Sequence, residues 1–502
     1  MKSASIQICG TGSGVGKSVI VAALCRIFLQ DGYKVAPFKA QNMALNSYVT
    51  LDGGEMGRAQ VVQAEACGIK PTVDMNPILI KPSSDTGAQI IVRGKPIGNM
   101  SVLKYTKYKN RGLSIVRRSL RKLLDEYEVV VMEGAGSPAE INLKSHDIVN
   151  LKMAEYAKSP VILVGDIDKG GVFAWIVGTL ELLTKKERKM IKGIIINKFR
   201  GDKTLLMPGI DYLEKRTGIK VLGIVPYYRD INIPEEDAVP LDSFKEKEGK
   251  KERKLNIDVI YLPHISNFTD FDALEREEDV RLRYVKSPQE LDSADMIIIP
   301  GTKNTIADLK YLKKSGLAKK IESIINSNKK TALAGICGGY QMLGSKIIDK
   351  DGLESKHGEE EGLKFLPVET SLKNEKTILR VKAKNLSSGI EVSGYEIHHG
   401  STRITGGCQP AFEVFECNSK KARYFDGARS PDKRIFGTYI HGLFDAAHFR
   451  RNLLNTLRKK RGWPPVSSKE NFTLDREFDK LAKLVRDSID MDLLYEILRK
   501  QA

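Results

Sequence analysis

The sequence predicts an α/β protein with two doubly wound domains, one after the other, and a helical C-terminal tail. Three features predict this fold. Apolar, β-rich runs alternate with helix-like segments in the N-terminal half, a charged stretch without apolar periodicity follows at 245–254, and a second alternating series comes after it. The predicted divisions are a first domain at 1–240, a linker at 241–254, a second domain at 255–447 and the tail at 448–502.

The first series contains six apolar runs that are typical of strands, and the second contains four. Helices cover both faces of a parallel sheet, so its strands appear in sequence as nearly continuous apolar runs. The first six are "ASIQIC", "YKVAPFK", "EVVVME", "PVILVGD", "GIIINKF" and "KVLGIVP", and the later four are "LNIDVIYLP", "ADMIIIPGT", "KKTALAGIC" and "RIFGTYIHG".

The tail is predicted to be helical and to pack against a core rather than to act as a lid. Its apolar residues recur at helical spacing, at Phe478, Leu481, Leu484, Val485 and Ile489.

The composition favours a soluble cytoplasmic protein. No apolar run reaches the ~18 residues that a membrane-spanning helix needs, so we expect no membrane contact. The N-terminus has no pattern of a signal peptide, because its first strand leads directly into glycines. The six cysteines are scattered without a C-x-x-C pair, which indicates neither a zinc site nor a disulfide framework.

The formal net charge is +18, from 81 Lys plus Arg against 63 Asp plus Glu. Such an excess is compatible with nucleic acid or with a polyanionic small substrate. The lysines are spread along the chain and no motif of interleaved aromatic and basic residues accompanies them, so we expect no nucleic-acid partner.

The stretch "GTGSGVGKS" at 10–18 lies between a predicted strand and a predicted amphipathic helix. Its glycines allow backbone N–H groups to converge on phosphate oxygens, and the helix N-terminus adds its dipole. We expect Lys17 to reach the β- and γ-phosphates and Ser18 to bind Mg²⁺. The expected nucleotide contacts are Thr11, Gly12, Gly14, Val15, Gly16, Lys17 and Ser18.

Other polar residues follow strands of the same predicted sheet. Glu133 ends "EVVVME", where an acid can hold Mg²⁺ directly or through water. Asp147 and Asp166 are further acids at probable strand or loop ends. Asn197 follows "III", where proteins with a phosphate loop often read the base, so we expect it to contact adenine.

Cys337 divides the apolar stretch "AGICGGYQMLG" at 334–344. It stands between a β-rich run and a helix-like run, with glycines at 335, 338 and 339. A tight strand-to-helix turn exposes a nucleophile, and small neighbours permit the strained backbone. The pattern therefore predicts a catalytic thiol rather than a structural cysteine.

The predicted base for this thiol is His441 in "GTYIHGLFD", also at the end of a strand. His398 and His399 of "GYEIHHG" are the rivals. The segment "PGTKN" at 300–304 ends another strand of this domain, and its backbone N–H groups are expected to complete an oxyanion hole with those near Cys337.

These motifs resemble known families. The phosphate loop, one residue longer than the usual pattern, resembles that of dethiobiotin synthetase, an enzyme that activates a carboxylate with ATP. Filament-forming and partitioning ATPases have a signature lysine near the start of this loop. Thr11 stands at that position here, which argues against a regulatory ATPase. The Cys337 domain resembles a class I glutamine amidotransferase, which implies a flavodoxin-like fold and release of ammonia from glutamine through a thioester. That family usually has an acid two residues after the histidine, but Leu443 stands here.

Nearly the whole chain resembles the cobyric acid synthases, through "FKAQNMALNS", "MNPILIKPSSDTGAQIIVRGK", "EGAGSPAEINL", "DIDKGGVFA", "NKFRGD" and the motifs above, in that order. This resemblance implies amidation of the b, d, e and g carboxylates of the corrinoid adenosylcobyrinic acid a,c-diamide, with ATP, Mg²⁺ and glutamine. The sister enzyme that makes the a,c-diamide has a Gly-Pro-Asp loop after a lysine in the first half of its chain. Here "AQNMALNS" follows Lys39, which favours the cobyric acid branch.

Two alternatives remain at this point. One is a regulatory ATPase with a vestigial amidotransferase domain, which the intact Cys337 and His441 argue against. The other is amidation of a different carboxylate, such as the a and c groups of cobyrinic acid or a cell-wall precursor.

Overall fold

The computed structural model describes residues 3–82, 87–228, 230–234, 254–354, 358–467 and 473–500. The linker expected at 241–254 lies outside these ranges except for its last residue. Contacts divide the chain into two compact units. The first comprises Met1–Ala44, Glu55–Glu236 and Phe472–Ala502, and the second comprises Leu45–Gly54 and Asp237–Asn471.

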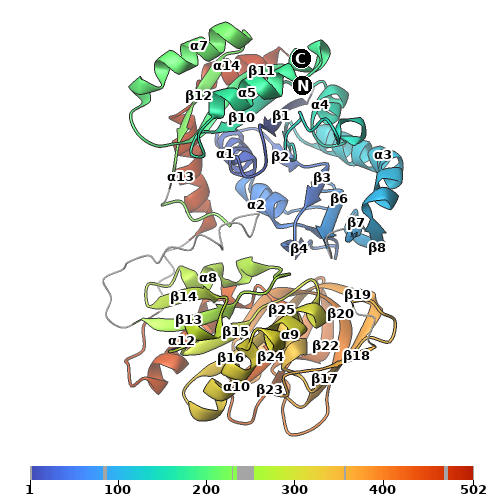
Figure 1. The fold of residues 1–502 in the computed structure, drawn as a ribbon, viewed down its shortest axis with the longest axis vertical. Helices are drawn as coiled ribbons and strands as arrows, with labels where there is room; N and C mark the ends of the chain where they lie inside the picture. The colour runs from blue at the N-terminus through green and yellow to red at the C-terminus, as the bar shows by residue number, and fades with distance from the viewer. Residues whose placement is uncertain are drawn as a thin grey trace. The chain divides into compact units, whose positions relative to one another are not determined.

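The first unit is built on a parallel six-stranded sheet, in the order β12-β11-β10-β1-β9-β2 (Figure 1). Each of the six apolar runs predicted for this half forms one of its strands. Their bounds are β1 Ala4–Gly10, β2 Val35–Phe38, β9 Val129–Glu133, β10 Val161–Asp166, β11 Ile191–Phe199 and β12 Val221–Pro226.

Helices cover both faces of this sheet, as the doubly wound prediction requires. Ile6 and Ile8 of β1 pack in a core with α1, α2, α13 (Leu474–Arg486) and α14 (Met491–Arg499), whereas Cys9 packs in another core with α4, α5 and α7. Successive side chains of a strand point to opposite faces, so one strand supplies both cores. The helices are α1 Lys17–Gln30, α2 Arg58–Ala66, α3 Val102–Glu126, α4 Leu151–Ala157, α5 Val172–Glu181, α6 Lys185–Arg188 and α7 Met207–Thr217.

A smaller four-stranded sheet, in the order β3-β6-β7-β8, lies between β2 and β9 in the sequence. The predicted series of apolar runs did not include it, because several of its strands are short or exposed. Its strands are β3 Gln41–Met43, β6 Ile78–Pro82, β7 Gly87–Val92 and β8 Lys95–Ser101, and β5 Glu55–Gly57 precedes α2.

The second unit contains a sheet in the order β14-β13-β15-β16-β24-β23. Its first five strands are parallel and follow the flavodoxin-like order 2-1-3-4-5, which confirms the predicted fold class. The elements are β13 Leu255–Ile260, α8 Asp272–Glu275, β14 Val280–Val285, β15 Met296–Ile299, α9 Thr305–Lys314, α10 Leu317–Ser327, β16 Ala332–Ile336, α11 Gly338–Leu343, β23 Ala428–Arg429 and β24 Ile435–Thr438.

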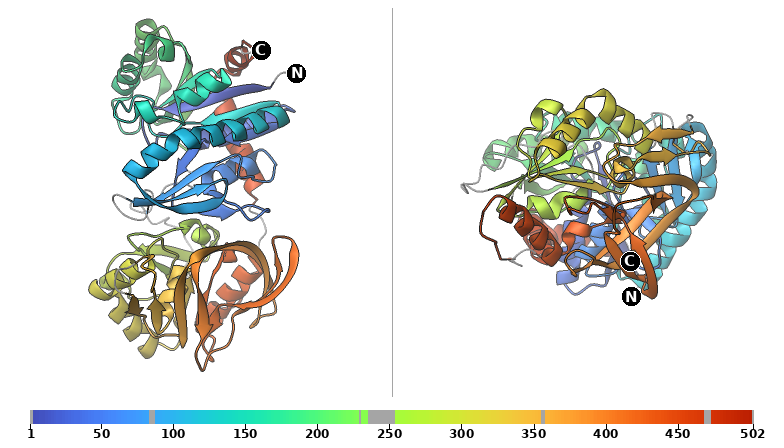
Figure 2. Two further views of the ribbon diagram at one scale, coloured as in Figure 1. Left: turned by 90° about the vertical axis from the view of Figure 1, so that its right-hand side faces the viewer. Right: turned by 90° about the horizontal axis from the view of Figure 1, so that it is seen from below.

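A second sheet of this unit was not predicted. Its two longest strands, β19 Val368–Asn385 and β20 Glu391–Ile404, pair antiparallel and form a long, curved ribbon (Figure 2). Many of their side chains are polar and exposed, so the ribbon gives no continuous apolar run. The other strands are β17 Lys346–Ile348, β18 Glu359–Glu361, β21 Phe412–Cys417, β22 Lys420–Asp426 and β25 Ile440–His441.

In the described part of the tail there are three helices, α12 Ala447–Lys460, α13 Leu474–Arg486 and α14 Met491–Arg499. We expected one extension over 448–502, but the helices divide between the units. Phe449, Leu454 and Leu457 of α12 pack in the core of the second unit. Residues of α13 and α14, including Phe478 and Leu481, pack in the α1 core of the first unit.

Among the described residues, no helix combines the length and the apolar character that crossing a membrane requires.

Candidate active sites

The phosphate loop has the strand–loop–helix geometry that its sequence predicts. Strand β1 ends at Gly10 and α1 begins at Lys17. Gly14 and Gly16 have positive φ angles of 68° and 96°, which residues with a side chain rarely adopt. A Cβ atom at Gly16 would also lie 2.1 Å from the Nδ2 atom of Asn197. The loop therefore requires glycine at these positions.

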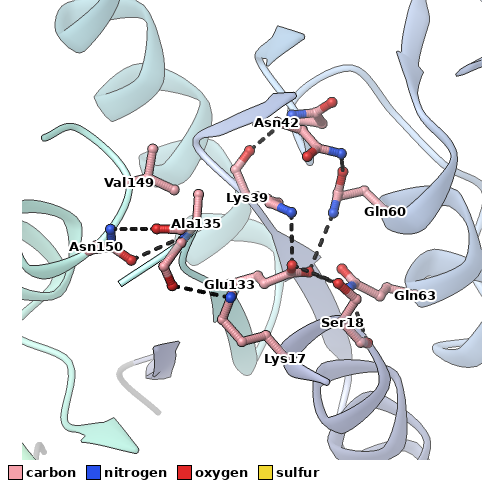
Figure 3. Close-up of polar contacts among 12 residues, drawn as sticks. Lys17, Ser18, Lys39, Asn42, Gln60, Gln63, Glu133, Ala135, Val149 and Asn150 are labelled. Carbon is pink, nitrogen blue, oxygen red and sulfur yellow. Dashed lines mark hydrogen bonds and ion pairs between the residues drawn. The ribbon is translucent and has the colours of Figure 1, made fainter. Parts of the chain in front are cut away.

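Lys17 lies within this loop, with its side chain largely buried. Its Nζ atom donates hydrogen bonds to the carbonyl oxygens of Gly12 (2.7 Å) and Gly136 (3.2 Å), as Figure 3 shows for the second contact. The N–H group of Thr11 donates to the carbonyl of Val164 and so ties the loop to β10. The Lys17 ammonium group is therefore held at the N-terminus of α1, where anions bind favourably.

Glu133 ends β9 and is 1% exposed. Its Oε1 atom accepts hydrogen bonds from Ser18 Oγ and Lys39 Nζ, both at 2.8 Å (Figure 3). Its Oε2 atom accepts from Gln63 Nε2 at 2.6 Å and from Gln60 Nε2 at 3.4 Å. The structure thus brings together Ser18 and Glu133, which the sequence predicted separately, and both carboxylate oxygens have donors.

Lys39, Gln60 and Gln63 were not predicted as site residues. Gln60 and Gln63 lie three residues apart on α2, so both side chains face β9. Asn42 Nδ2 donates to Gln60 Oε1 at 2.9 Å and extends the network toward the small sheet. The three-residue spacing of the two glutamines was the only feature of the sequence that could have predicted their role. It is a weak indication, because polar pairs with this spacing usually lie on the solvent-facing side of a helix.

The Ser18 hydroxyl and the Glu133 carboxylate provide two adjacent hard oxygen atoms, which suit Mg²⁺. In the part of the chain described here, no group of three or more His, Cys, Asp or Glu residues could hold a metal ion. Mg²⁺ commonly takes one or two protein oxygens and completes its shell with phosphate oxygens and water, so this small donor set fits it. Because Lys39 and Ser18 already bond to Oε1, the arrangement favours a contact of Glu133 through water.

Asn197 is buried, and its Nδ2 atom donates to the carbonyl of Val15 at 2.9 Å. Asn197 therefore stabilises the phosphate loop, and its contact with adenine stays a prediction. Beside it, Lys198 Nζ donates to Gly14 O at 2.6 Å and pairs with Asp166 at 2.9 Å. Asp166 thus supports the loop through Lys198.

Asp147 has a local role. Its Oδ1 atom accepts from the N–H groups of Val149 and Asn150, at 2.9 and 3.0 Å. The Asn150 side chain in turn bonds to both backbone polar groups of Ala135, just after Glu133 (Figure 3). This acid stabilises a turn that holds the loop following β9.

In the second unit, Cys337 connects β16 to α11 with φ 52° and ψ −108°, a strained conformation for a residue with a side chain. A Cβ atom at Gly339 would lie 2.0 Å from the carbonyl oxygen of Ile299, and one at Gly338 would lie 2.7 Å from Thr302 Cγ2. The glycines that predicted a nucleophile turn are therefore required by close backbone packing.

His441 is oriented by Asp270, a residue that sequence reasoning missed. The His441 Nδ1 atom lies 2.6 Å from Asp270 Oδ2, and the N–H group of Gly442 donates to Asp270 Oδ1 at 2.9 Å. Both side chains are buried. Leu443, where the amidotransferase family usually has an acid, is buried in the core. The acid comes instead from a segment 171 residues earlier, so spacing along the sequence gave no signal.

Burial alone would lower the pKa of His441, but the Asp270 carboxylate and the hydrogen bond with Cys337 raise it to about 10. Asp270 and Cys337 face the ring, and Tyr395 stacks on it at a centroid distance of 5.4 Å. At neutral pH the imidazole is therefore a cation and can donate a proton in this site.

The segment 300–304 lies beside this pair, as predicted. A Cβ atom at Gly301 would be 3.1 Å from His441 Cε1 and 3.7 Å from Cys337 Cβ, and one at Gly338 would be 3.3 Å from the backbone nitrogen of Thr302. The 300–304 segment and the turn after Cys337 are therefore in close contact, as a shared oxyanion hole would require.

The rival histidines have other partners. The His398 ring stacks on Tyr439 at 3.7 Å, and its Nδ1 atom lies 3.0 Å from the carbonyl of Gly400. His399 Nδ1 lies 3.1 Å from the carbonyl of Lys373. The geometry thus favours His441 as the base.

Replacing Asp270 with asparagine is expected to lower the rate of glutamine hydrolysis by at least about tenfold. The carboxylate stabilises the imidazolium, so its loss lowers the pKa of His441 from about 10 toward its ordinary value of 6.5. The alkaline limb of the pH–rate profile should therefore move to lower pH. Asp292→Asn, at an exposed ion pair, is the control. An unmoved alkaline limb would contradict the role of Asp270.

Residues 6–241 match the family described as "CobQ/CobB/MinD/ParA nucleotide binding domain", and residues 256–449 match "CobB/CobQ-like glutamine amidotransferase domain". Two proteins described as "Cobyric acid synthase", from Clostridium botulinum (strain 657 / Type Ba4) and Dehalococcoides mccartyi (strain CBDB1), are each 51% identical to this chain, over 99% of both sequences. A solved structure described as "glutamine amidotransferase" aligns with a TM-score of 0.30 and 13% identity, over 41% of this chain and 98% of its own.

Proposed function

Since this chain belongs to the family of the cobyric acid synthases, we propose that it amidates the b, d, e and g carboxylates of adenosylcobyrinic acid a,c-diamide. The reaction is ATP-dependent and uses glutamine as the amide donor. One observation supports this most strongly: a phosphate loop with Glu133 and a Cys337–His441–Asp270 triad are encoded in one chain. An enzyme that activates carboxylates and generates ammonia needs both sites.

Glutamine hydrolysis is assigned to the triad. The Cys337 thiolate attacks the carboxamide carbon of glutamine, and backbone N–H groups near Gly301 and Gly338 stabilise the oxyanion. His441 donates its proton to the leaving nitrogen, which departs as ammonia and leaves a thioester. Water, deprotonated by His441, then attacks the thioester and the Cys337 thiolate leaves. Glutamate and one proton are released, which restores the thiolate–imidazolium pair.

Amide formation is assigned to the first unit. A carboxylate oxygen of the corrinoid attacks the γ-phosphorus of ATP, and ADP leaves, so that an acyl phosphate forms. Lys17 stabilises the charge on the transferring phosphoryl group. When bound by Ser18 and Glu133, Mg²⁺ would neutralise further phosphate charge. Ammonia attacks the acyl carbon, phosphate leaves and one proton is released, which gives the carboxamide.

Lys39 is assigned a supporting role in this step. Its ammonium group bonds to Glu133 in a buried pair, so it holds that carboxylate in its orientation beside Ser18. The nucleotide contacts are assigned to Thr11, Gly12, Gly14, Val15, Gly16, Lys17, Ser18 and Asn197.

The six cysteines are all free thiols. This supports the proposal that the enzyme works in the reducing cytoplasm. Product analysis with the a,c-diamide as the only corrinoid tests the substrate assignment. Addition of four amides is expected, and an unchanged a,c-diamide would contradict the assignment.

A further inference from the structure

A segment of the N-terminal half belongs to the amidotransferase unit. Residues Leu45–Gly54, here called the strap, group with the second unit, although the chain before and after them groups with the first. The strap contains β4 (Ser47–Val49) and the end of "AQNMALNS", the motif that favoured the cobyric acid branch. Asn46 and Ser47 are each 1% exposed, so the segment is well packed.

The strap bonds to the loop that carries Asp270. Asn46 Oδ1 accepts a hydrogen bond from the N–H group of Phe268 at 3.2 Å, and Asn267 Oδ1 accepts one from the N–H group of Ser47 at 2.9 Å. Asn267 has a positive φ of 53°, and its carbonyl accepts from the N–H group of Asp270. This reciprocal pair therefore fixes the turn from which the Asp270 carboxylate reaches His441.

The strap also supports the other face of the histidine ring. The Tyr48 ring packs against Tyr395 at a centroid distance of 5.3 Å, and Tyr395 stacks on His441 with an interplanar angle of 18°. Arg380 donates to the Tyr48 hydroxyl and lies over its ring. Val49 packs in one apolar cluster with Tyr395 and its neighbour Ile397.

The Ile397 carbonyl also contacts the nucleophile, at 3.5 Å from Cys337 Sγ. The strap therefore contacts the turn before Asp270, the ring of Tyr395 and the side chain of Ile397, whose carbonyl group contacts Cys337. The contacts described here join the strap to Phe268, Asn267 and Tyr395, so its effect on the reaction passes through the groups that those residues position.

We propose that the strap is a positioning element of the glutaminase site, supplied by the N-terminal half of the sequence, which holds Asp270 and Tyr395 against His441. This inference rests on the proposed role of Cys337 and His441 in glutamine hydrolysis. Residues 255–447 carry the whole triad. If the proposal holds, some of the residues that orient the triad lie outside this range, in the strap.

The test uses full-length variants of Asn46 and Tyr48. Asn46→Ala removes the acceptor for the buried Phe268 N–H group, and Tyr48→Ala removes the ring behind Tyr395. Each is expected to lower kcat for glutamine about tenfold or more and to leave KM for glutamine within about twofold, because small misplacements of catalytic groups mainly slow turnover. Asn46→Ala should also move the alkaline limb of the pH–rate profile for glutamine hydrolysis to lower pH, as is expected for Asp270→Asn. Synthesis with ammonium chloride, measured on the same preparations, should keep its wild-type rate.

Tyr48→Phe is the matched variant, because it keeps the ring on Tyr395 and loses only the hydroxyl group. It should restore most of the glutamine-dependent kcat lost in Tyr48→Ala. The proposal is overturned if Asn46→Ala and Tyr48→Ala hydrolyse glutamine like the wild type, or if they lose glutamine- and ammonium-dependent synthesis together. If the wild type itself hydrolyses no glutamine, or does so without Cys337, the proposed function fails instead.

Discussion

Replacing Cys337 with alanine should reduce glutamine-dependent amidation by on the order of a thousandfold or more and leave amidation with ammonium salts largely intact. The thiol serves only the release of ammonia, because no other group in the triad can form the thioester. Both rates can be measured on one preparation by following ADP formation in the presence of corrinoid, with glutamine or with ammonium chloride.

Cys408→Ala is the matched control, since Cys408 is a half-buried free thiol at the edge of the core, with its sulfur 4.0 Å from the carbonyl oxygen of Pro367. It should keep both activities. If Cys337→Ala lost both activities to the same extent, or kept its glutamine-dependent rate, the thiol would not be the source of ammonia.

Replacing Lys17 with alanine should have the opposite pattern. Synthesis with either nitrogen donor is expected to fall by about a hundredfold or more, because formation of the acyl phosphate needs the charge that Lys17 places against the phosphates. Glutamine hydrolysis should survive, since the triad lies in the other unit. Measuring glutamate and ADP separately distinguishes the two reactions.

Lys220→Ala removes a lysine from an exposed surface ion pair with Glu214 and is the control for loss of positive charge. It should be close to wild type. Synthesis by Lys17→Ala at the wild-type rate with ammonium chloride would exclude the assigned role of the phosphate loop.

The parallel sheets could be predicted because strands buried on both faces leave continuous apolar runs, as in "EVVVME" for β9. The antiparallel ribbon of β19 and β20 could not, because its residues alternate between buried and exposed positions and many are charged. The division of the tail helices between the two units also could not be predicted. Apolar spacing in α13 predicts a buried face, but it does not say which core covers that face.

Local motifs predicted the parts of both sites that depend on neighbouring residues. Gly14 and Gly16 before Lys17 have positive φ angles, and the glycines at 335, 338 and 339 around Cys337 have no room for a Cβ atom, so sequence and geometry agree at these positions. Asp270 and Lys39 could not be assigned in this way. Each acts through a contact with a residue far along the chain, His441 or Glu133, and only the fold brings these pairs together.

The sequence contains one phosphate-loop motif and one acid like Glu133, so four carboxylates must visit a single synthetase site in turn. Mass spectrometry of the corrinoids, starting from the a,c-diamide with ATP, Mg²⁺ and glutamine labelled with ¹⁵N in its amide, tests this account most directly. It predicts transient species with one, two and three added amides, followed by a product with four, each carrying ¹⁵N. An a,c-diamide that stays unchanged while cobyrinic acid is converted to it, or amides that lack the label, would contradict the account.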